Sequence, residues 1–192
     1  MTREIVGKTH KAERQKWRTD PALAARVVQV FGIDLDAMAT RHDTIVPRFI
    51  CDPADPASTW PINEAVAIDA LDPLVRWQDH GRAIFVNPPF EMLSRGRLIE
   101  QIGSAVEGGA LVVMLAPDNG DTRWYSRLVD WGAHVWRFRG RPRYVPAIEQ
   151  IEDRAGAAFP SALYVLRPPL WARSRGASIP TFAVDPKTLA FL

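Results

Sequence analysis

The sequence predicts an α/β fold: a single domain with a mostly parallel, twisted sheet and an antiparallel pair of strands near the C-terminus. Two apolar runs, 83–87 and 110–116, have the composition of strands that are buried on both faces. Segments with helical spacing of apolar residues separate the expected strands, which is typical of parallel sheets. The length of 192 residues suits one domain.

Composition narrows the class of protein. The net charge of +2 is small, and Cys51 is the single cysteine, so we expect neither a disulfide framework nor a cysteine metal site. We see no signal-like segment and no apolar run long enough to cross a bilayer. These features predict a cytoplasmic protein that has no membrane partner and binds no metal. They say nothing about its oligomeric state.

The N-terminal part begins with a polar, charged segment, 1–16, which we expect to be a flexible arm. Thr19 or Asp20 can cap a helix over 21–30, because Pro21 suits a first helical position. A short strand over 33–36 then ends in Asp36, followed by small residues. A carboxylate in this place suits a cofactor ammonium or a ribose hydroxyl, and equally a helix cap.

Five prolines interrupt residues 43–80, where we expect a loop at 51–60, a short strand or helix at 63–68, and one helical turn at 71–77. The strand at 83–87 follows. The spacing of apolar residues then predicts a helix over 91–106, which Gly108 and Gly109 end.

The most informative stretch is the end of the first apolar run, Asn87-Pro88-Pro89-Phe90. Proline has no N–H for a sheet ladder, so the strand must end at Asn87, at the sheet edge where ligands bind in open α/β folds. The Asn87 side-chain oxygen and a main-chain carbonyl fixed by the prolines are two acceptors for an exocyclic amine, and Phe90 can stack on its ring. The alternative is a proline turn with Phe90 packed in the core.

The second half of the chain continues the alternation of strands and helices. We expect a buried strand at 110–116, a loop at 117–120, a helix at 121–130, strands at 133–138 and 162–166, a long loop at 145–159, and a C-terminal extension at 169–192. Arginines are frequent in the last third, which predicts either a phosphate-binding surface or a solvated face.

Six segments and the pair Leu71 and Trp77, in order over 17–168, resemble the phage-type DNA N6-adenine methyltransferase (Dam-like) family. Trp17-Arg18-Thr19-Asp20-Pro21 is similar to its Trp-x-Thr-Pro opening, with Asp20 as an extra residue. Asn87 to Phe90 match its (Asp/Asn/Ser)-Pro-Pro-(Tyr/Phe/Trp) tetrapeptide. The other matching segments are Leu35 to Thr40, Leu115-Ala116-Pro117 with Asp121 to Trp124, Arg139-Gly140-Arg141 and Phe159-Pro160-Ser161.

The resemblance implies a Rossmann-like methyltransferase domain over 17–168 that moves a methyl group from S-adenosylmethionine to N6 of adenine in DNA. It further implies base flipping and direct attack by the amine. Asn87, Pro88, Pro89 and Phe90 are then the catalytic residues. The candidate cofactor residues are Trp17, Thr19, Asp36 and Asp69, although no Gly-x-Gly loop follows Asp36; the candidate DNA contacts are Arg123, Arg139 and Arg141.

Three other functions stay open at this point, and the weakest of them is methylation of the amide of a glutamine in a protein. Cytosine N4 is also an exocyclic amine on a planar ring, so a cytosine-N4 methyltransferase uses the same tetrapeptide. The chain can also be a phage DNA-binding protein that keeps the fold without turnover. Arg141 has a second possible role, since an ion pair with Asp118 would hold two loops together instead of binding DNA. If the gene belongs to a phage, the expected location is the host cytoplasm.

Overall fold

A computed structural model describes residues 17–41, 43–53, 65–146, 160–168 and 181–190. The arm predicted at 1–16 and most of the predicted loops at 51–60 and 145–159 lie outside these residues. The helices are α2 (Pro21–Phe31), α3 (Gly96–Glu107) and α4 (Arg123–Asp130), with 3-10 turns η2 (Trp77–Asp79) and η3 (Phe90–Met92). The strands are β1 (Trp17–Thr19), β2 (Leu35–Ala39), β3 (Phe49–Cys51), β4 (Ala67–Ile68), β5 (Ala83–Val86), β6 (Leu111–Pro117), β7 (His134–Phe138), β8 (Tyr144–Pro146), β9 (Ser161–Leu166) and β10 (Thr181–Val184).

Eight of the strands form one sheet in the order β10-β7-β9-β6-β5-β2-β3-β4. Every neighbouring pair is parallel except those of β9, which runs antiparallel to both β6 and β7. The predicted mostly parallel sheet with a C-terminal antiparallel pair is therefore confirmed. The strands β1 and β8 form a separate two-stranded antiparallel sheet.

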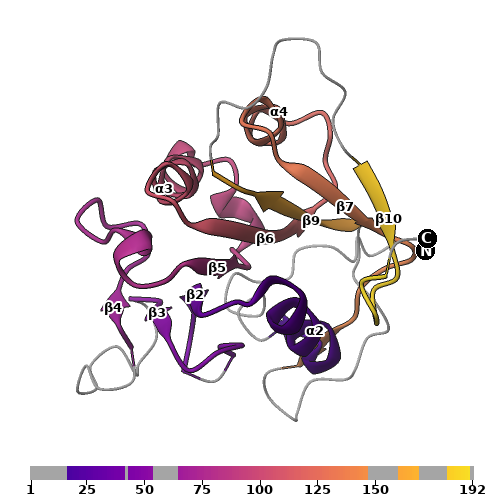
Figure 1. The fold of residues 1–192 in the computed structure, drawn as a ribbon, viewed down its shortest axis with the longest axis horizontal. Helices are drawn as coiled ribbons and strands as arrows, with labels where there is room; N and C mark the ends of the chain where they lie inside the picture. The colour runs from indigo at the N-terminus through magenta and orange to yellow at the C-terminus, as the bar shows by residue number, and fades with distance from the viewer. Residues whose placement is uncertain (1–16, 42, 54–64, 147–159, 169–180, 191–192) are drawn as a thin grey trace, which may run out of the picture.

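Helices cover the two faces of the sheet, α2 on one side and α3 and α4 on the other (Figure 1). Alternation along β5 shows why both faces are apolar. Ile84 and Val86 belong to the core cluster under α3 and α4, whereas Phe85 belongs to the cluster that contains Leu23 and Val27 of α2. The strand is buried on both sides, as a central parallel strand should be.

The helix after β5 starts later than predicted. Residues 90–92 form the 3-10 turn η3, and the α-helix begins only at Gly96 instead of near residue 91. The physical reason is the pair of prolines: Pro89 is extended, with φ −53° and ψ 126°, and it starts a tight turn before the helix. Similarly, α4 begins at Arg123 because the Thr122 side chain accepts a hydrogen bond from the N–H of Tyr125.

The first parallel strand is also displaced from the prediction. It was expected at 33–36, but β2 runs from Leu35 to Ala39. The Asp34 carboxylate accepts hydrogen bonds from the N–H groups of Arg82 and Ala83 and thereby holds the segment just before the strand. Asp36 consequently lies inside β2 and not at its end.

Four strands were not predicted, namely β1, β3, β8 and β10. β8 lies at the start of the segment expected to be a loop, and it pairs with β1. β10 lies inside the expected C-terminal extension, yet it extends the main sheet by pairing in parallel with β7. Val184 of β10 is buried, and the ring of Phe182 lies 6.2 Å from that of Trp136. The sheet therefore reaches beyond the expected domain boundary at residue 168.

Candidate active site at the carboxyl edge of the sheet

The order of strands places a ligand site between β2 and β5. From β2 the chain proceeds through β3 and β4 toward one edge of the sheet, whereas β5 pairs with the opposite side of β2 and is followed by β6. Connections that leave the two neighbouring strands in opposite directions open a crevice at their carboxyl ends. Asp36 of β2 and Asn87 after β5 both come from this pair of strands.

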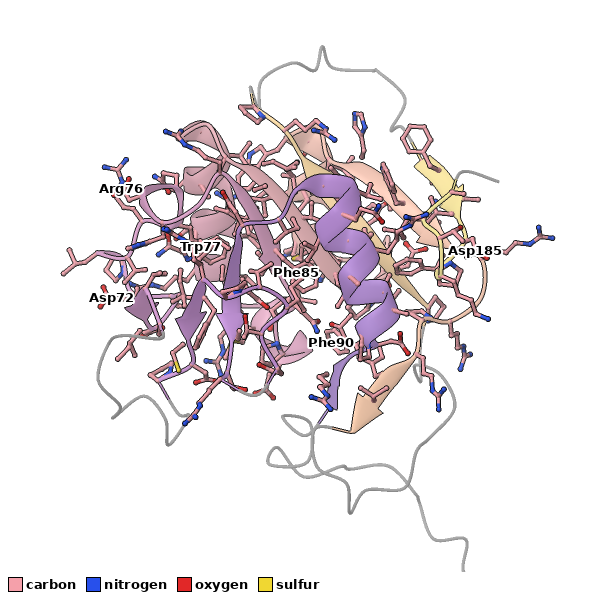
Figure 2. All side chains as sticks on the ribbon, turned by 60° about the horizontal axis from the view of Figure 1, so that its bottom comes forward. Asp72, Arg76, Trp77, Phe85, Phe90 and Asp185 are labelled. Carbon is pink, nitrogen blue, oxygen red and sulfur yellow. The ribbon has the colours of Figure 1, made fainter. Side chains whose placement is uncertain are left out.

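Asn87 lies on the side of the sheet that α2 covers. Asp36 and Phe85 are register partners in the parallel β2–β5 pair, and Phe85 packs against the α2 cluster. Side chains two residues apart in an extended segment point to the same side, so Asn87 follows Phe85. Figure 2 shows Phe85 under α2 and Phe90 further toward the ends of the strands.

The tetrapeptide turns the chain sharply after β5. The carbonyl of Pro89 accepts a hydrogen bond from the N–H of Met92 at 2.8 Å, and that of Phe90 accepts one from Leu93 at 3.2 Å. The turn therefore uses these two carbonyls and not that of Pro88. Phe90 is half-buried and packs against the α3–α4 core cluster, so it is anchored without being enclosed.

Thr19 and Asn87 meet directly. The Asn87 side-chain Nδ2 donates a hydrogen bond to Thr19 Oγ1 at 3.0 Å. Thr19 ends β1, and the next residue, Asp20, caps α2 by accepting from the N–H groups of Ala22 and Leu23. Thr19 and Asp20 were both predicted as possible caps of this helix, and the structure shows that Asp20 is the cap. The Thr19 side chain points to the site instead.

Asp36 is a buried carboxylate, 3% exposed. Its Oδ2 accepts a hydrogen bond from the N–H of Ile45 at 3.1 Å, and its Oδ1 makes a longer contact of 3.4 Å with the N–H of Met38. Burial raises the pKa of Asp36 from 3.8 to about 7, helped by the nearby charge of Asp43 and opposed by the two N–H groups. A cation bound here would stabilise the ionised form.

Asp69 lies at the same edge, at the end of β4. Its N–H donates to the carbonyl of Cys51, and its carboxylate accepts from the N–H of Leu71 at 3.0 Å. Its φ of 60° is in the left-handed region, which an aspartate adopts in tight turns. The buried Trp77 supports this turn, since its Nε1 donates to the carbonyl of Ala70 (Figure 2). β4 is separated from β2 by β3, so Asp69 does not adjoin Asn87.

Trp17 lies in β1, where its backbone pairs with Pro146 of β8. Among the candidate cofactor residues, Thr19 contacts the tetrapeptide through its hydrogen bond with Asn87. Asp36 belongs to β2, the strand beside β5, and Asp69 follows β4, further along the same edge of the sheet.

The three candidate DNA contacts are exposed and lie at this edge of the sheet. Arg139 and Arg141 follow the carboxyl end of β7, and Arg123 begins the helix that follows β6. A helix that follows a parallel strand starts at the carboxyl edge. Gly140 has a φ of 96°, which a residue with a side chain rarely adopts, so the glycine permits the turn between Arg139 and Arg141.

The predicted alternative role of Arg141 is corrected by the structure, because Asp118 pairs with Arg137. Arg137 Nε lies 2.6 Å from Asp118 Oδ2.

Sequence reasoning also missed the N–H of Ile45 as the partner of Asp36. Arg137 is a charged residue in a largely apolar strand, and this was the signal in the sequence that it has a partner. Nothing in the sequence indicates that the N–H of Ile45 donates to Asp36.

Two further findings concern metal ligands and membrane-spanning helices. Within the described ranges, no group of three or more histidine, cysteine or acidic side chains is arranged to hold a metal ion. In the same residues, no helix combines the length and the apolar character needed to cross a membrane.

The residues present fit S-adenosylmethionine, which carries a positive sulfonium and a positive ammonium. The buried Asp36 supplies a carboxyl group at the β2–β5 crevice, where burial raises its pKa to about 7. Asp36 would hold the ammonium, and Asp69 would accept hydrogen bonds from hydroxyl or amino groups.

Comparisons with known proteins agree with this geometry. The family model described as DNA N-6-adenine-methyltransferase (Dam) matches residues 6–179. No curated protein shows significant sequence similarity to the chain. The structure resembles that of a putative RNA methyltransferase from Pyrococcus horikoshii, with 13% identity, a TM-score of 0.52, and coverage of 86% of this chain and 97% of that one.

A predicted O-methyltransferase from Agrobacterium tumefaciens is also similar, with 11% identity, a TM-score of 0.49, and coverage of 87% of this chain and 86% of that chain. The match to the Pyrococcus horikoshii structure, at 13% identity, bears on the fold alone, whereas the family model matches most of the sequence. The chain therefore belongs to the DNA N-6-adenine-methyltransferase (Dam) family and is an S-adenosylmethionine-dependent methyltransferase with a Rossmann-like fold.

Proposed function

We propose that the protein methylates N6 of adenine in DNA. The observation that carries this proposal is the Asn87 side chain, held by Thr19 at the carboxyl end of β5 and followed by the rigid Pro88-Pro89-Phe90 turn. The family's description supports adenine in DNA as the substrate. The exposed arginines at the same edge support a nucleic acid partner.

Each residue of the turn has a distinct role in the proposed reaction. S-Adenosylmethionine, when bound, supplies a methyl group activated by a sulfonium. Asn87 Oδ1 and the Pro88 carbonyl accept hydrogen bonds from the two N–H groups of the adenine amine. These acceptors orient the amine nitrogen toward the methyl carbon and stabilise the positive charge that grows on nitrogen. Asn87 and Pro88 would hold the amine while the methyl group passes from the sulfonium to nitrogen, and the nitrogen would then lose a proton to solvent.

The target base must leave the helix to reach this edge, which costs about a few kcal/mol. Phe90 is half-buried and anchored on the core, so it can offer a ring face to the flipped base. Stacking of a base on an aromatic ring contributes roughly 1–3 kcal/mol and offsets part of that cost. Pro89 contributes by fixing the start of the turn that presents Phe90.

Arg123, Arg139 and Arg141 would bind the phosphates around the flipped base. Arg123 begins α4 after β6, whereas Arg139 and Arg141 follow β7, so the three side chains come from two separate places along the edge. Phosphate contacts of this kind position a duplex without reading its sequence. Other groups of the protein therefore have to read the base sequence around the target adenine.

The proposal is tested by incubating the purified protein with S-adenosylmethionine carrying a labelled methyl group. One sample contains mixed-sequence duplex DNA, and a second contains an RNA transcript of the same sequence. The products are digested to nucleosides and the labelled nucleoside is identified. We expect label in N6-methyladenine from DNA. Label in N4-methylcytosine would correct the base, and label confined to RNA would contradict DNA as the substrate.

A further inference from the structure

Thr19 contacts the amide of Asn87 across 68 residues of sequence. Thr19 is 7% exposed, and the bond from Asn87 Nδ2 to Thr19 Oγ1 measures 3.0 Å. The threonine belongs to a small two-stranded sheet, whereas Asn87 follows the central strand of the main one. A buried hydroxyl is thus delivered to Asn87 from a separate structural unit.

The orientation of the amide matters because its two ends have opposite hydrogen-bonding character. The oxygen accepts hydrogen bonds, whereas the nitrogen donates two. If the amide were reversed, Nδ2 would face the N–H groups of the target amine, and two donors would oppose each other. A hydroxyl can donate as well as accept, but here Thr19 Oγ1 accepts from Asn87 Nδ2, which leaves Oδ1 as the end that faces the substrate.

Thr19 is itself fixed from both sides along the chain. In β1 it pairs with Tyr144 of β8. Directly after it, Asp20 caps α2, and Pro21 occupies the first turn of that helix. Since Asp20 satisfies the helix terminus, the Thr19 hydroxyl is not needed for capping and serves the contact with Asn87.

We propose that Thr19 is a positioning residue for methyl transfer, which fixes the Asn87 amide so that Oδ1 faces the target amine. This inference rests on the proposed function. It differs from the cofactor-binding role that the resemblance implies for Thr19, because it assigns the hydroxyl to orientation of Asn87. The two roles predict different kinetic defects.

The first test compares Thr19→Val, which keeps the shape and removes the hydroxyl, with Thr19→Ser, which keeps the hydroxyl. We expect Thr19→Val to lower kcat roughly 10- to 100-fold and Thr19→Ser to restore most of it, with the Kd for S-adenosylmethionine changed less than about threefold in both. Thr188→Val is the matched control, since it also removes a threonine hydroxyl, one that bonds Asp185 and the N–H of Ala190 and not Asn87. A Kd that rises in step with the loss of activity would overturn positioning in favour of cofactor binding.

The second test uses the double variant with Asn87→Asp. A carboxylate has two oxygen ends, so it has no wrong orientation, and Thr19→Val should lower kcat less than about threefold in the Asn87→Asp background. An equal loss in both backgrounds would contradict the proposal.

The third test needs no substrate and separates this inference from the proposed function. In NMR spectra of the cofactor-free protein, the Asn87 side-chain NH₂ should be protected from exchange in wild type and Thr19→Ser but not in Thr19→Val. Equal protection in all three would overturn the positioning role, even if DNA is methylated. Loss of protection in Thr19→Val alone would support it, even if another substrate replaces DNA.

Discussion

Arg137 of β7 and Asp118 at the end of β6 form an ion pair, with Nε and Oδ2 2.6 Å apart. The two strands are not neighbours, because β9 lies between them. The pair therefore ties the β6 exit loop to the strand that leads into Arg139 and Arg141. Tyr125 of α4 adds a weaker contact of 3.5 Å from its hydroxyl to Arg137. Asp118 raises the pKa of Arg137, chiefly through the hydrogen bond between the two side chains.

Arg137→Met should lower the free energy of unfolding by about 1–3 kcal/mol, because it leaves the largely buried Asp118 carboxylate without its cation. Denaturant unfolding measures this change. The double variant Arg137→Met with Asp118→Leu should recover most of the loss. A double variant as unstable as the sum of the single variants would show that the two side chains act independently.

Asn87→Ala should reduce methyl transfer by at least about 100-fold, because it removes the acceptor for the target amine. Cofactor affinity and the melting temperature should stay close to wild type. Asn87→Asp is the matched control, since it keeps an acceptor oxygen and should retain activity. Steady-state kinetics with calorimetric titration of S-adenosylmethionine separate these effects, and full activity of Asn87→Ala would remove Asn87 from the reaction.

Phe90→Ala should slow turnover roughly 5- to 100-fold, since the lost stacking contributes roughly 1–3 kcal/mol to the flipped state. Phe90→Tyr should be tolerated, because the ring is kept. A fluorescent adenine analogue at the target position reports flipping directly. Unchanged flipping in a folded Phe90→Ala variant would mean that Phe90 serves only to pack the core.

Arg139→Gln and Arg141→Gln should each weaken DNA binding and reduce the slope of log K against log salt by about 1, as expected when one phosphate contact is lost. Titration of DNA at several salt concentrations measures this slope. Arg76→Gln is a suitable control, because Arg76 is exposed and precedes η2 before β5, and its described ion pair is with Asp79. A slope unchanged in all three variants would place the DNA elsewhere.

Asp36 should make both stability and cofactor binding depend on pH. Its pKa is raised to about 7 in the folded protein, so between about pH 4 and pH 7 the folded state binds more protons than the unfolded state. Its contribution to stability therefore falls as pH rises through this window and levels off above it. The affinity for the cationic cofactor should rise between pH 6 and pH 8, as Asp36 ionises.

Thermal unfolding and cofactor titration at several pH values check both trends against Asp36→Asn, in which the group cannot titrate. The differences in melting temperature and in cofactor affinity between wild type and Asp36→Asn should change with pH. If both proteins respond to pH in the same way, another group is responsible.

The sequence predicted most of the parallel sheet because its central strands are short, apolar and bounded by prolines and glycines. The end of β5 was found for the same reason, since Pro88 cannot continue a strand. β10 could not be found this way, because its existence depends on the free edge of β7, which is far away in sequence.

Within the candidate site, Asn87 and Phe90 were identifiable because the tetrapeptide is local. The contact between Thr19 and Asn87 was not, since it depends on how β1 and β5 are brought together. Asp36 was recognised as a candidate, but its position inside β2 and its hydrogen bond with Ile45 depend on the path of the chain after the strand.

The most direct test of the central claim is nucleoside mass spectrometry of DNA from a methylation-deficient bacterial host that expresses this protein, beside the same host expressing Asn87→Ala at an equal level. We predict N6-methyladenine with the unmodified protein and none with the variant. The absence of N6-methyladenine from a host that contains the folded unmodified protein, or its presence with both proteins, would contradict the claim.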